Sequence, residues 1–238
     1  MKAIILAAGR GERMRPYEPD KHKVMLPLVD GTPIIGCVVN RLVRYGFEPV
    51  IAISANEYGS QIRDHFDGDA RVKISEAQDP SGTAGEVYNA MGYLKGEKTF
   101  LVYYGDIVAN IDLAAMQRQH EIEKNIVTLC AKRDMQSPEG LMRKDGETVE
   151  VLEKPLIDVR ELGWDGANCA IFFAENSVLG YIERMKREYP IELDFSNNIF
   201  PALYRDRIRM GIYIHEGFYH NVGDVKVAKT VANMSLDF

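Results

Sequence analysis

Glycines and charged side chains occur together at two points in the first hundred residues, in strings that favour phosphate binding. One string is Gly9-Arg-Gly-Glu-Arg-Met-Arg-Pro16 and the other is Asp79-Pro-Ser-Gly-Thr-Ala-Gly85. Glycine turns let backbone N–H groups approach an anion closely, and guanidinium or ammonium groups add fixed positive charge. Between Arg10 and Lys23 there are five basic and three acidic residues, although the whole chain has a net charge of −6. The predicted ligand is therefore a small anion.

The first string does not fit two well-known phosphate-binding loops. A dinucleotide fingerprint needs a third glycine where this chain has Met14, and an acid after the second strand, where it has Ser54-Ala-Asn56. The sequence contains no GxxxxGK[ST] string of a Walker loop. An NAD-linked oxidoreductase is therefore disfavoured. A glycine turn with Arg13 close behind it can still bring backbone N–H groups and a guanidinium to one polyphosphate.

Apolar runs alternate with amphipathic stretches in the first half of the chain, which predicts a mainly parallel sheet covered by helices on both faces. Thr32 is the predicted N-cap of the first helix, with Pro33 as its first residue and Gly46 as its end. Thr83 and Glu86 have capping-box spacing at the start of a later helix. The predicted strands are 2–8, 50–53, 71–75 and 99–104, and the helices include 33–46, 58–66 and 83–91.

The second half of the chain has a looser pattern, which predicts mixed β-structure. The predicted strands are 126–131, 139–142, 148–152, 168–174 and 208–214, with helices over 112–123, 178–186 and 225–234. We find no repeat, low-complexity tract or Pro/Gly/Ser-rich linker. The predicted architecture is a single domain, 1–238, with a Rossmann-like three-layer α/β/α fold and two halves, 1–110 and 111–238.

Polar residues follow several of the predicted strands. Gly105-Asp106 comes after strand 99–104, and Glu153-Lys154 comes after strand 148–152. Ligands of open α/β sheets bind beyond the carboxyl ends of the strands, so these groups are expected to meet the glycine turns at one edge. An acid and several cations at such an edge are suited to a phosphate and its metal ion.

The composition is that of a folded protein in a reducing compartment. The 238 residues are 46% hydrophobic and 27% charged, and the cysteines Cys37, Cys130 and Cys169 form no CxxC pair. No apolar run approaches the ~18 residues that span a bilayer. We therefore expect a cytoplasmic location and no membrane partner. We also expect no nucleic-acid partner, because an acidic chain is a poor match for a nucleic-acid backbone.

These strings resemble the signature of the sugar-1-phosphate nucleotidyltransferases. Leu6-Ala-Ala-Gly-Arg-Gly-Glu-Arg-Met-Arg-Pro16 followed by Lys23-Val-Met-Leu-Pro27 carries the likeness. Further matches follow in the family's order, so the resemblance covers essentially the whole chain. They are Pro80-Ser-Gly-Thr-Ala-Gly85, Gly105-Asp106, Glu153-Lys-Pro155, Asn168-Cys-Ala-Ile171, Ile199-Phe-Pro201 and 218–223.

The resemblance implies that a sugar 1-phosphate attacks the α-phosphorus of a nucleoside triphosphate (NTP) and expels pyrophosphate. It assigns residues 1–110 to the nucleotide and 111–238 to the sugar phosphate, with a homo-oligomer allowed. Arg13 and Lys23 would supply catalytic charge, and Asp106 would hold Mg²⁺. The nucleotide would be bound by Leu6, Ala7, Ala8, Gly9, Gly11, Gln78 and Gly82, and the sugar phosphate by Glu153, Lys154 and Asn168.

The chain departs from the family pattern at three points. Asn221-Val-Gly-Asp224 stands where a second metal-binding aspartate is usual, so Asn221 offers a neutral oxygen and Asp224 is a further candidate ligand. Ala77 replaces the usual base-reading Gln or Glu, for which Glu76 or Gln78 could substitute. Ala170 replaces a glycine, and its methyl group is expected to narrow the sugar pocket.

The sequence is compatible with two other functions. One is a cytidylyltransferase acting on a non-sugar phosphomonoester such as phosphocholine. The other is a regulatory protein that binds a nucleotide sugar with little turnover, because one metal-binding charge is missing. Pyrophosphate release distinguishes an enzyme from a sensor.

Overall fold

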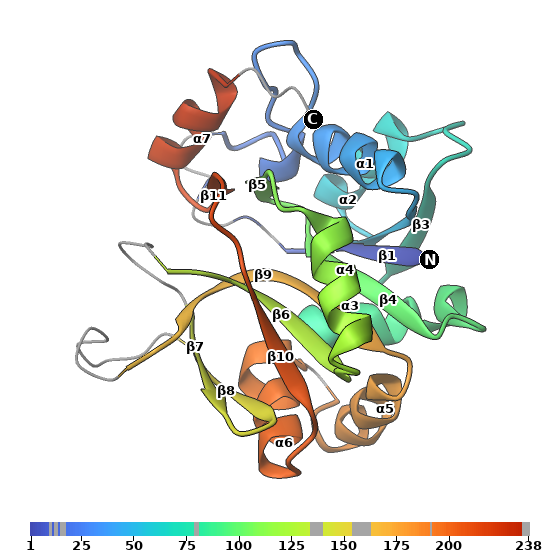
Figure 1. The fold of residues 1–238 in the computed structure, drawn as a ribbon. Coiled ribbons are helices and arrows are strands. Elements are labelled where there is room, and N and C mark those ends of the chain that lie inside the picture. Colours follow the sequence, from blue (N-terminus) through green and yellow to red (C-terminus); the bar gives the residue numbers. More distant parts are fainter. Residues whose placement is uncertain are drawn as a thin grey trace.

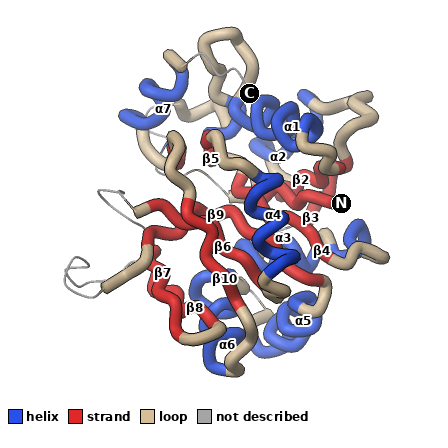
Figure 2. Tube along the Cα trace, viewed as in Figure 1, coloured by secondary structure: helices blue, strands red, loops and turns tan. Residues whose placement is uncertain are grey.

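The computed structural model describes residues 1–9, 11, 14, 18–78, 81–133, 140–153, 163–190 and 192–234. Its largest sheet has the strand order β10-β6-β9-β4-β1-β2-β3, and β5 and β11 form a separate two-stranded sheet (Figures 1 and 2). The strands are β1 (Lys2–Leu6), β2 (Glu48–Ser54), β3 (Lys73–Ala77), β4 (Thr99–Tyr104), β5 (Ile107–Ala109), β6 (Val127–Lys132), β7 (Gly140–Asp145), β8 (Thr148–Glu153), β9 (Gly166–Glu175), β10 (Met210–Ile214) and β11 (Tyr219–Asn221).

The large sheet is mixed and consists of two parallel parts separated by one antiparallel strand. Strand β1 pairs in parallel with β2 and β4, β2 with β3, and β10 with β6. Strand β9 runs antiparallel to both β4 and β6 and joins the two parallel parts. The hairpin β7–β8 pairs with the first residues of β9. The predicted mixed, mainly parallel sheet is confirmed.

Helices cover both faces of this sheet, so the predicted three-layer α/β/α architecture is also confirmed. One face packs against α1, α2 and α4, and the other against α3, α5 and α6 (Figure 1). Because consecutive β1 residues point to opposite faces, Ile4 belongs to one core and Ile5 to the other. The helices are α1 (Ile34–Arg44), α2 (Glu57–His65), α3 (Thr83–Asn89), α4 (Leu113–Ile122), α5 (Val178–Glu188), α6 (Phe200–Arg205) and α7 (Val225–Ala232).

A third, smaller core ties the small sheet to the start of α1 and to α7. Val108 of β5, Val222 after β11 and Val231 of α7 are buried together with Ile34 of α1. In the small sheet Asn221 pairs with Ile107, and the N–H of Val222 donates to the carbonyl oxygen of Asp106 (2.9 Å). This pairing holds residue 106 next to residue 221.

Helix α1 begins one residue later than predicted. Pro33 is the N-cap of the helix rather than its first residue, and the side chain of Thr32 does not cap the helix. The N–H of Thr32 instead donates to Oδ1 of Asp30 (2.9 Å). The N–H of Ile34 donates to the carbonyl of Leu26 (3.1 Å), so the segment before the helix is held extended through Pro33, whose φ is −67° and ψ 151°.

The capping box predicted at Thr83 is wrong. Gly82 is the N-cap of α3, and the Thr83 hydroxyl donates to Oδ1 of Asp194 (2.9 Å) while accepting the N–H of Phe195 (3.0 Å). Gly82 has φ +78°, and a Cβ there would lie 2.6 Å from the carbonyl oxygen of Leu193. Tertiary contact with residues 193–195 therefore replaces the local cap.

Other predicted boundaries agree with the structure to within a few residues. Strand β4 has the predicted bounds, β3 begins two residues later, and residue 139 of a predicted strand lies outside the described residues. Strands β5 and β11, helix α6 and a π-helical turn over Phe195–Ile199 were not predicted.

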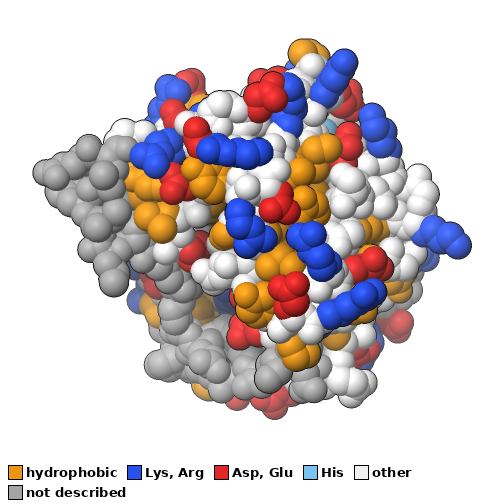
Figure 3. Space-filling view, turned by 90° about the horizontal axis from the view of Figure 1, so that it is seen from below, with side chains coloured by type: hydrophobic (Ala, Val, Ile, Leu, Met, Phe, Trp, Pro, Cys, Tyr) orange, Lys and Arg blue, Asp and Glu red, His pale blue; other side chains and the backbone are white. Residues whose placement is uncertain are grey.

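The surface over α5 and α6 carries basic and acidic side chains intermingled (Figure 3). Arg184 and Asp206 form an ion pair there at 3.6 Å. Among the described residues, no helix combines the length and apolar character that crossing a bilayer requires.

Candidate functional site

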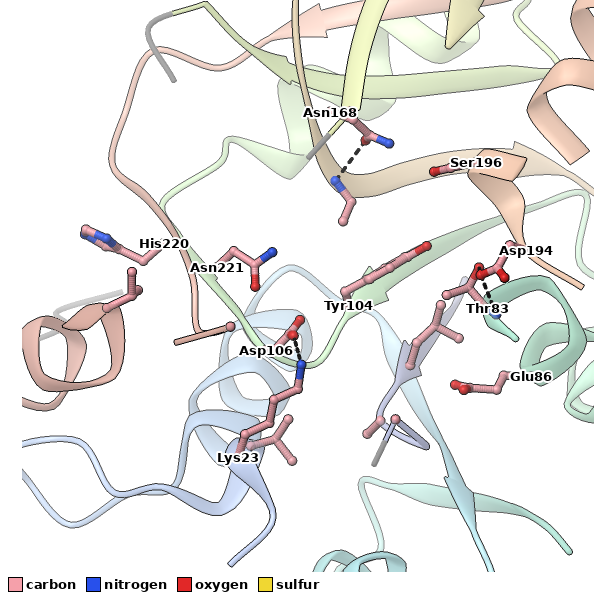
Figure 4. A pocket seen from close by; sticks show the side chains of 18 of the residues that line it. Lys23, Thr83, Glu86, Tyr104, Asp106, Asn168, Asp194, Ser196, His220 and Asn221 are labelled. Carbon is pink, nitrogen blue, oxygen red and sulfur yellow. Dashed lines mark hydrogen bonds and ion pairs between the residues drawn. The ribbon is translucent and has the colours of Figure 1, made fainter. Parts of the chain in front are cut away.

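A cavity of about 540 Å³ opens beyond the carboxyl ends of β1 and β4. Parallel strands of an α/β sheet end at such an edge, which is where ligands of this architecture bind. Leu6 and Ala7 at the end of β1 line it, as do Tyr104 at the end of β4 and Asn168 on β9 (Figure 4). The cavity thus collects groups from both halves of the chain.

Lys23 and Asp106 form an ion pair at one end of this cavity (Figure 4). A 3₁₀ turn, Lys23–Met25, presents the lysine, and the turn between β4 and β5 presents the aspartate. Their side chains are 18% and 13% exposed, so both are largely withdrawn from water. A Lys ammonium carries three N–H donors, and one bond to Asp106 leaves donors for an anion.

Asn221 lies beside Asp106 in the wall of the cavity (Figure 4). Its Oδ1 is buried and has no hydrogen-bond partner among the residues that the structure describes. A buried oxygen of this kind is normally satisfied, because leaving it unpaired costs ~1–3 kcal/mol. A carboxylate and an orphaned amide oxygen side by side are hard donors suited to Mg²⁺, which usually takes few protein ligands and keeps several waters.

Asp224 also lines the cavity, but its carboxylate has a structural partner. Its Oδ1 accepts the N–H of Val227 (3.0 Å) and caps α7. No group of three or more His, Cys, Asp or Glu side chains with metal-binding geometry occurs within the described ranges. The residues at this end therefore fit an ion held by one or two protein oxygens and completed by a phosphate.

His22 joins Gly9, which follows β1, to the 3₁₀ turn that presents Lys23. Its Nε2 donates to the carbonyl of Gly9 (2.8 Å), and its Nδ1 accepts the N–H of Val24 (3.3 Å). These bonds require the neutral ring, and burial lowers the pKa of His22 below its ordinary value, although the Gly9 carbonyl opposes this shift. A buried imidazole thus holds Gly9 and Val24 in place on either side of it.

Glu86 lies on the other side of the β1 strand end, on α3, and is 7% exposed. One of its carboxyl oxygens accepts the backbone N–H of Ala8, while Oε2 has no partner in the described part of the chain. Burial raises the pKa of Glu86 to about 8; the nearby Asp194 and Asp106 carboxylates add to the rise, and the Ala8 bond opposes it. The group is therefore mainly protonated near neutral pH.

The far end of the cavity is polar and comes mainly from the second half of the chain. Asn168 accepts the N–H of Ala170 (2.9 Å) through Oδ1, which leaves its amide NH₂ for a ligand (Figure 4). Ala170 lines the cavity at φ +57°. Glu153 and Ser196 add acceptor and hydroxyl groups there. Such groups are suited to the hydroxyls of a sugar.

The left-handed backbone of Ala170 predicts a gain in stability on replacement by glycine. A non-glycine residue at positive φ costs ~1–3 kcal/mol, and the greater freedom of glycine in the unfolded chain offsets part of that. We expect Ala170→Gly to raise the free energy of unfolding by about 1 kcal/mol and Tm by about 2–4 °C. Thermal and urea unfolding measure this.

Ala174→Gly on the same strand is the matched control, because Ala174 is equally apolar and is not among the residues at positive φ. It is expected to lower stability by ~1 kcal/mol. Equal losses in the two variants would contradict the assigned strain.

The structure brings most of the predicted site residues to the cavity. Those lining it are Leu6, Ala7, Gly9, Lys23, Asp106, Glu153, Asn168, Asn221 and Asp224. Ala8, Gly11, Gln78 and Gly82 are described but do not line it, and Gln78 is exposed. Glu76, the other candidate for reading the base, bonds Arg63 (2.6 Å). Arg13 and Lys154 lie outside the described residues.

The sequence interpretation missed several lining residues, which are His22, Thr83, Glu86, Tyr104, Asp194, Ser196, Asn197, Tyr219 and His220. Residues 194–197 follow no strand of the predicted pattern and reach the cavity through their contact with α3. The capping-box prediction gives Glu86 a local role at the start of its helix. The signal that could have identified it as a cavity residue is its charge among apolar neighbours at the start of α3.

Comparisons with known proteins show what this chain is similar to. A family model described as nucleotidyl transferase matches residues 2–234. The chain is 29% identical over 225 residues to a bifunctional GlmU protein of Methanococcus aeolicus, covering 94% of this chain and 51% of that one. Over 132 residues it is 42% identical to an N-acetylmuramate alpha-1-phosphate uridylyltransferase of Neisseria meningitidis, covering 53% and 56%. The chain thus spans about half the length of these curated relatives.

A solved structure with the same fold is that of a Bacillus anthracis protein assigned as a glucose-1-phosphate thymidylyltransferase and containing sucrose. The TM-score is 0.82 at 18% sequence identity, covering 100% of this chain and 98% of that one. At this identity the likeness establishes the shared fold.

Proposed function

Because the chain belongs to the nucleotidyl transferase family, we propose that it transfers a nucleoside monophosphate from an NTP to a sugar 1-phosphate. One observation carries this proposal. The Lys23–Asp106 pair lies at one end of a cavity, and polar side chains suited to binding hydroxyls lie at its other end. The first end suits a polyphosphate, and the second suits a sugar. An acceptor phosphate between them would face the α-phosphorus.

In the proposed reaction an oxygen of the sugar phosphate forms a bond to the α-phosphorus of the NTP. The bond from that phosphorus to the bridging oxygen breaks, and the electron pair leaves with pyrophosphate. Negative charge gathers on the α-phosphate oxygens, so a fixed cation in a water-poor site is the main requirement. Lys23 supplies it, and its bond to Asp106 holds the ammonium in place. Arg13 and Lys154 are proposed as further cations.

Asp106 and Asn221 are the residues proposed to hold a divalent ion, with Asp224 as a further candidate. Bound there, Mg²⁺ would neutralise phosphate charge and orient the triphosphate. Backbone groups of Leu6, Ala7 and Gly9 are proposed to contact the nucleotide, and Glu153 and Asn168 the sugar.

Replacing Asn221 with aspartate is expected to strengthen the metal site. A second carboxylate beside Asp106 adds one negative charge to the ligand set, so the half-saturating Mg²⁺ concentration in the reaction should fall ~10-fold. Without metal the two carboxylates repel each other, so Tm should fall in EDTA and recover when Mg²⁺ is added. Activity against Mg²⁺ concentration and thermal unfolding with and without the ion measure both effects.

Asn198→Asp is a matched control on the π-helical turn, and it should leave the Mg²⁺ dependence unchanged, because Asn198 does not line the cavity. If Asn221→Asp needs as much Mg²⁺ as the wild type, Asn221 is not at the metal site.

A matrix of four NTPs against a panel of sugar 1-phosphates, read by pyrophosphate release, tests the proposed function. We expect release with at least one pair and a nucleotide sugar as the second product. Among the residues that the structure describes, five acids line the cavity, so a cationic phosphomonoester such as phosphocholine belongs in the panel as the second candidate acceptor. They are Glu86, Asp106, Glu153, Asp194 and Asp224. Nucleotide binding without any release would favour a sensor.

The remaining expectations extend this proposal. We propose one catalytic domain, with residues 1–110 serving mainly the nucleotide and 111–238 the sugar phosphate. A cytoplasmic location is part of the same proposal, and a homo-oligomer is compatible with it.

A further inference from the structure

Glu86 is a buried acid that the proposed reaction does not use. It lies in the wall of the cavity, and its carboxyl group points toward the end of β1 (Figure 4). The bond from Ala8 N–H occupies one oxygen, and Oε2 has no partner in the described ranges. A buried carboxyl oxygen left unpaired is costly, so a group of the bound ligand is expected to meet it.

The position of Glu86 relative to the Lys23–Asp106 pair indicates which group of a bound NTP would meet Oε2. Glu86 lines the same cavity as Lys23 and Asp106, the residues proposed to bind phosphate and metal (Figure 4). In an NTP the group attached directly to the phosphates is the ribose, and the base lies one group further away. A polar atom beside the β1 strand end and near the phosphate site therefore matches the ribose.

We propose that Oε2 of Glu86 hydrogen-bonds a ribose hydroxyl of the NTP and thereby selects ribonucleotides over deoxyribonucleotides. This inference rests on the proposed nucleotidyltransferase function. A hydroxyl both donates and accepts, so it can pair with the carboxyl group in either protonation state. Sites built to bond a substrate hydroxyl discriminate strongly against the analogue that lacks it, because the site's own polar group is then left unpaired.

The bond to Ala8 supports a competing role, in which Glu86 only anchors the strand end. Two variants separate the roles. Glu86→Gln keeps an oxygen for the Ala8 N–H and presents an amide NH₂ that can still donate to a hydroxyl. Glu86→Leu keeps the approximate volume and removes both bonds. Loss of an anchor lowers the reaction rate with every nucleotide. Loss of a ribose contact changes the ratio of kcat/KM between the ribonucleotide and its deoxy analogues.

The experiment compares kcat/KM for the NTP that the wild type uses best with its 2′-deoxy and 3′-deoxy analogues. We expect the wild type to prefer the ribonucleotide over one analogue by about 10–100-fold. Glu86→Leu should bring that ratio close to one by losing activity on the ribonucleotide, while Glu86→Gln stays within a few-fold of the wild-type ratio. Glu121→Leu, on the exposed face of α4, is the control and should change nothing.

Each other outcome overturns the inference. A wild type that uses the ribonucleotide and both analogues equally has no ribose contact of this kind. If Glu86→Leu lowers all rates in parallel, Glu86 is an anchor; if it changes the preference among the four bases instead, it contacts the base. Absence of pyrophosphate from every triphosphate with every acceptor would refute the proposed function itself.

Discussion

Replacing Lys23 with alanine is expected to lower kcat/KM by about 100- to 1000-fold, which corresponds to ~3–4 kcal/mol of lost transition-state stabilisation. The ammonium is largely withdrawn from water and bound to Asp106, so it is preorganised to meet charge that develops on the α-phosphate. Water entering the space left by the side chain cannot reproduce a fixed charge. Steady-state pyrophosphate release measures the loss.

Lys2→Ala is the matched control for this prediction. It also removes a lysine from an ion pair, with Glu48, but at the amino-terminal ends of β1 and β2 and outside the cavity. Its activity should equal that of the wild type, and its stability should change by no more than ~1 kcal/mol. Near-normal turnover in a folded Lys23→Ala variant would remove Lys23 from the catalytic machinery.

Replacing Asp106 with asparagine is expected to lower activity by ~100-fold or more and to raise the Mg²⁺ concentration needed for half-maximal rate. The substitution conserves size but removes the charged oxygen from the proposed metal site, where the neighbouring proposed ligand, Asn221, is already neutral. It also leaves the Lys23 ammonium without its anionic partner. Rates measured against Mg²⁺ and against Mn²⁺ separate lost metal affinity from lost rate at saturation.

Asp112→Asn provides the comparison, because Asp112 caps α4 away from the cavity and asparagine is an equally good cap. This variant should keep both its rate and its Mg²⁺ dependence. If Asp106→Asn retains the wild-type Mg²⁺ dependence, the metal is held elsewhere.

The layers of the fold could be predicted because burial on both faces leaves a simple pattern. Strand β4 reads as a continuous apolar run and has the predicted bounds. Helix α1 differs by one residue at its start, because a hydrogen bond between Ile34 and Leu26 extends the preceding segment through Pro33. Local propensity carries no information about such a contact.

The small sheet could not be predicted, although its strand β11 lines the end of the cavity that contains Asp106. Strands β5 and β11 have three residues each and pair across more than a hundred positions of the chain. Short strands leave little periodicity, and their register depends on the third core around Val108 and Val222. The resemblance named Asp106 and Asn221, and the pairing explains why they are neighbours.

The opposite wall shows a local signal overridden by tertiary structure. Thr83 and Glu86 have the spacing of a capping box, yet Thr83 bonds Asp194 and Glu86 bonds Ala8. Gly82 can approach Leu193 only because it lacks a Cβ, and that contact brings residues 194–197 to the cavity. Long-range contacts of this kind decided which polar groups became available to a ligand.

The fate of the α-phosphorus tests the central claim most directly. The wild-type protein is incubated with the preferred acceptor and Mg²⁺, in parallel, with NTP labelled at the α- or the γ-phosphate. We expect the α-label to move entirely into the nucleotide sugar and the γ-label to appear in pyrophosphate. Recovery of the γ-label as inorganic phosphate, with the α-label in nucleoside diphosphate, would place the attack at another phosphorus and contradict the proposed role of the Lys23–Asp106 end.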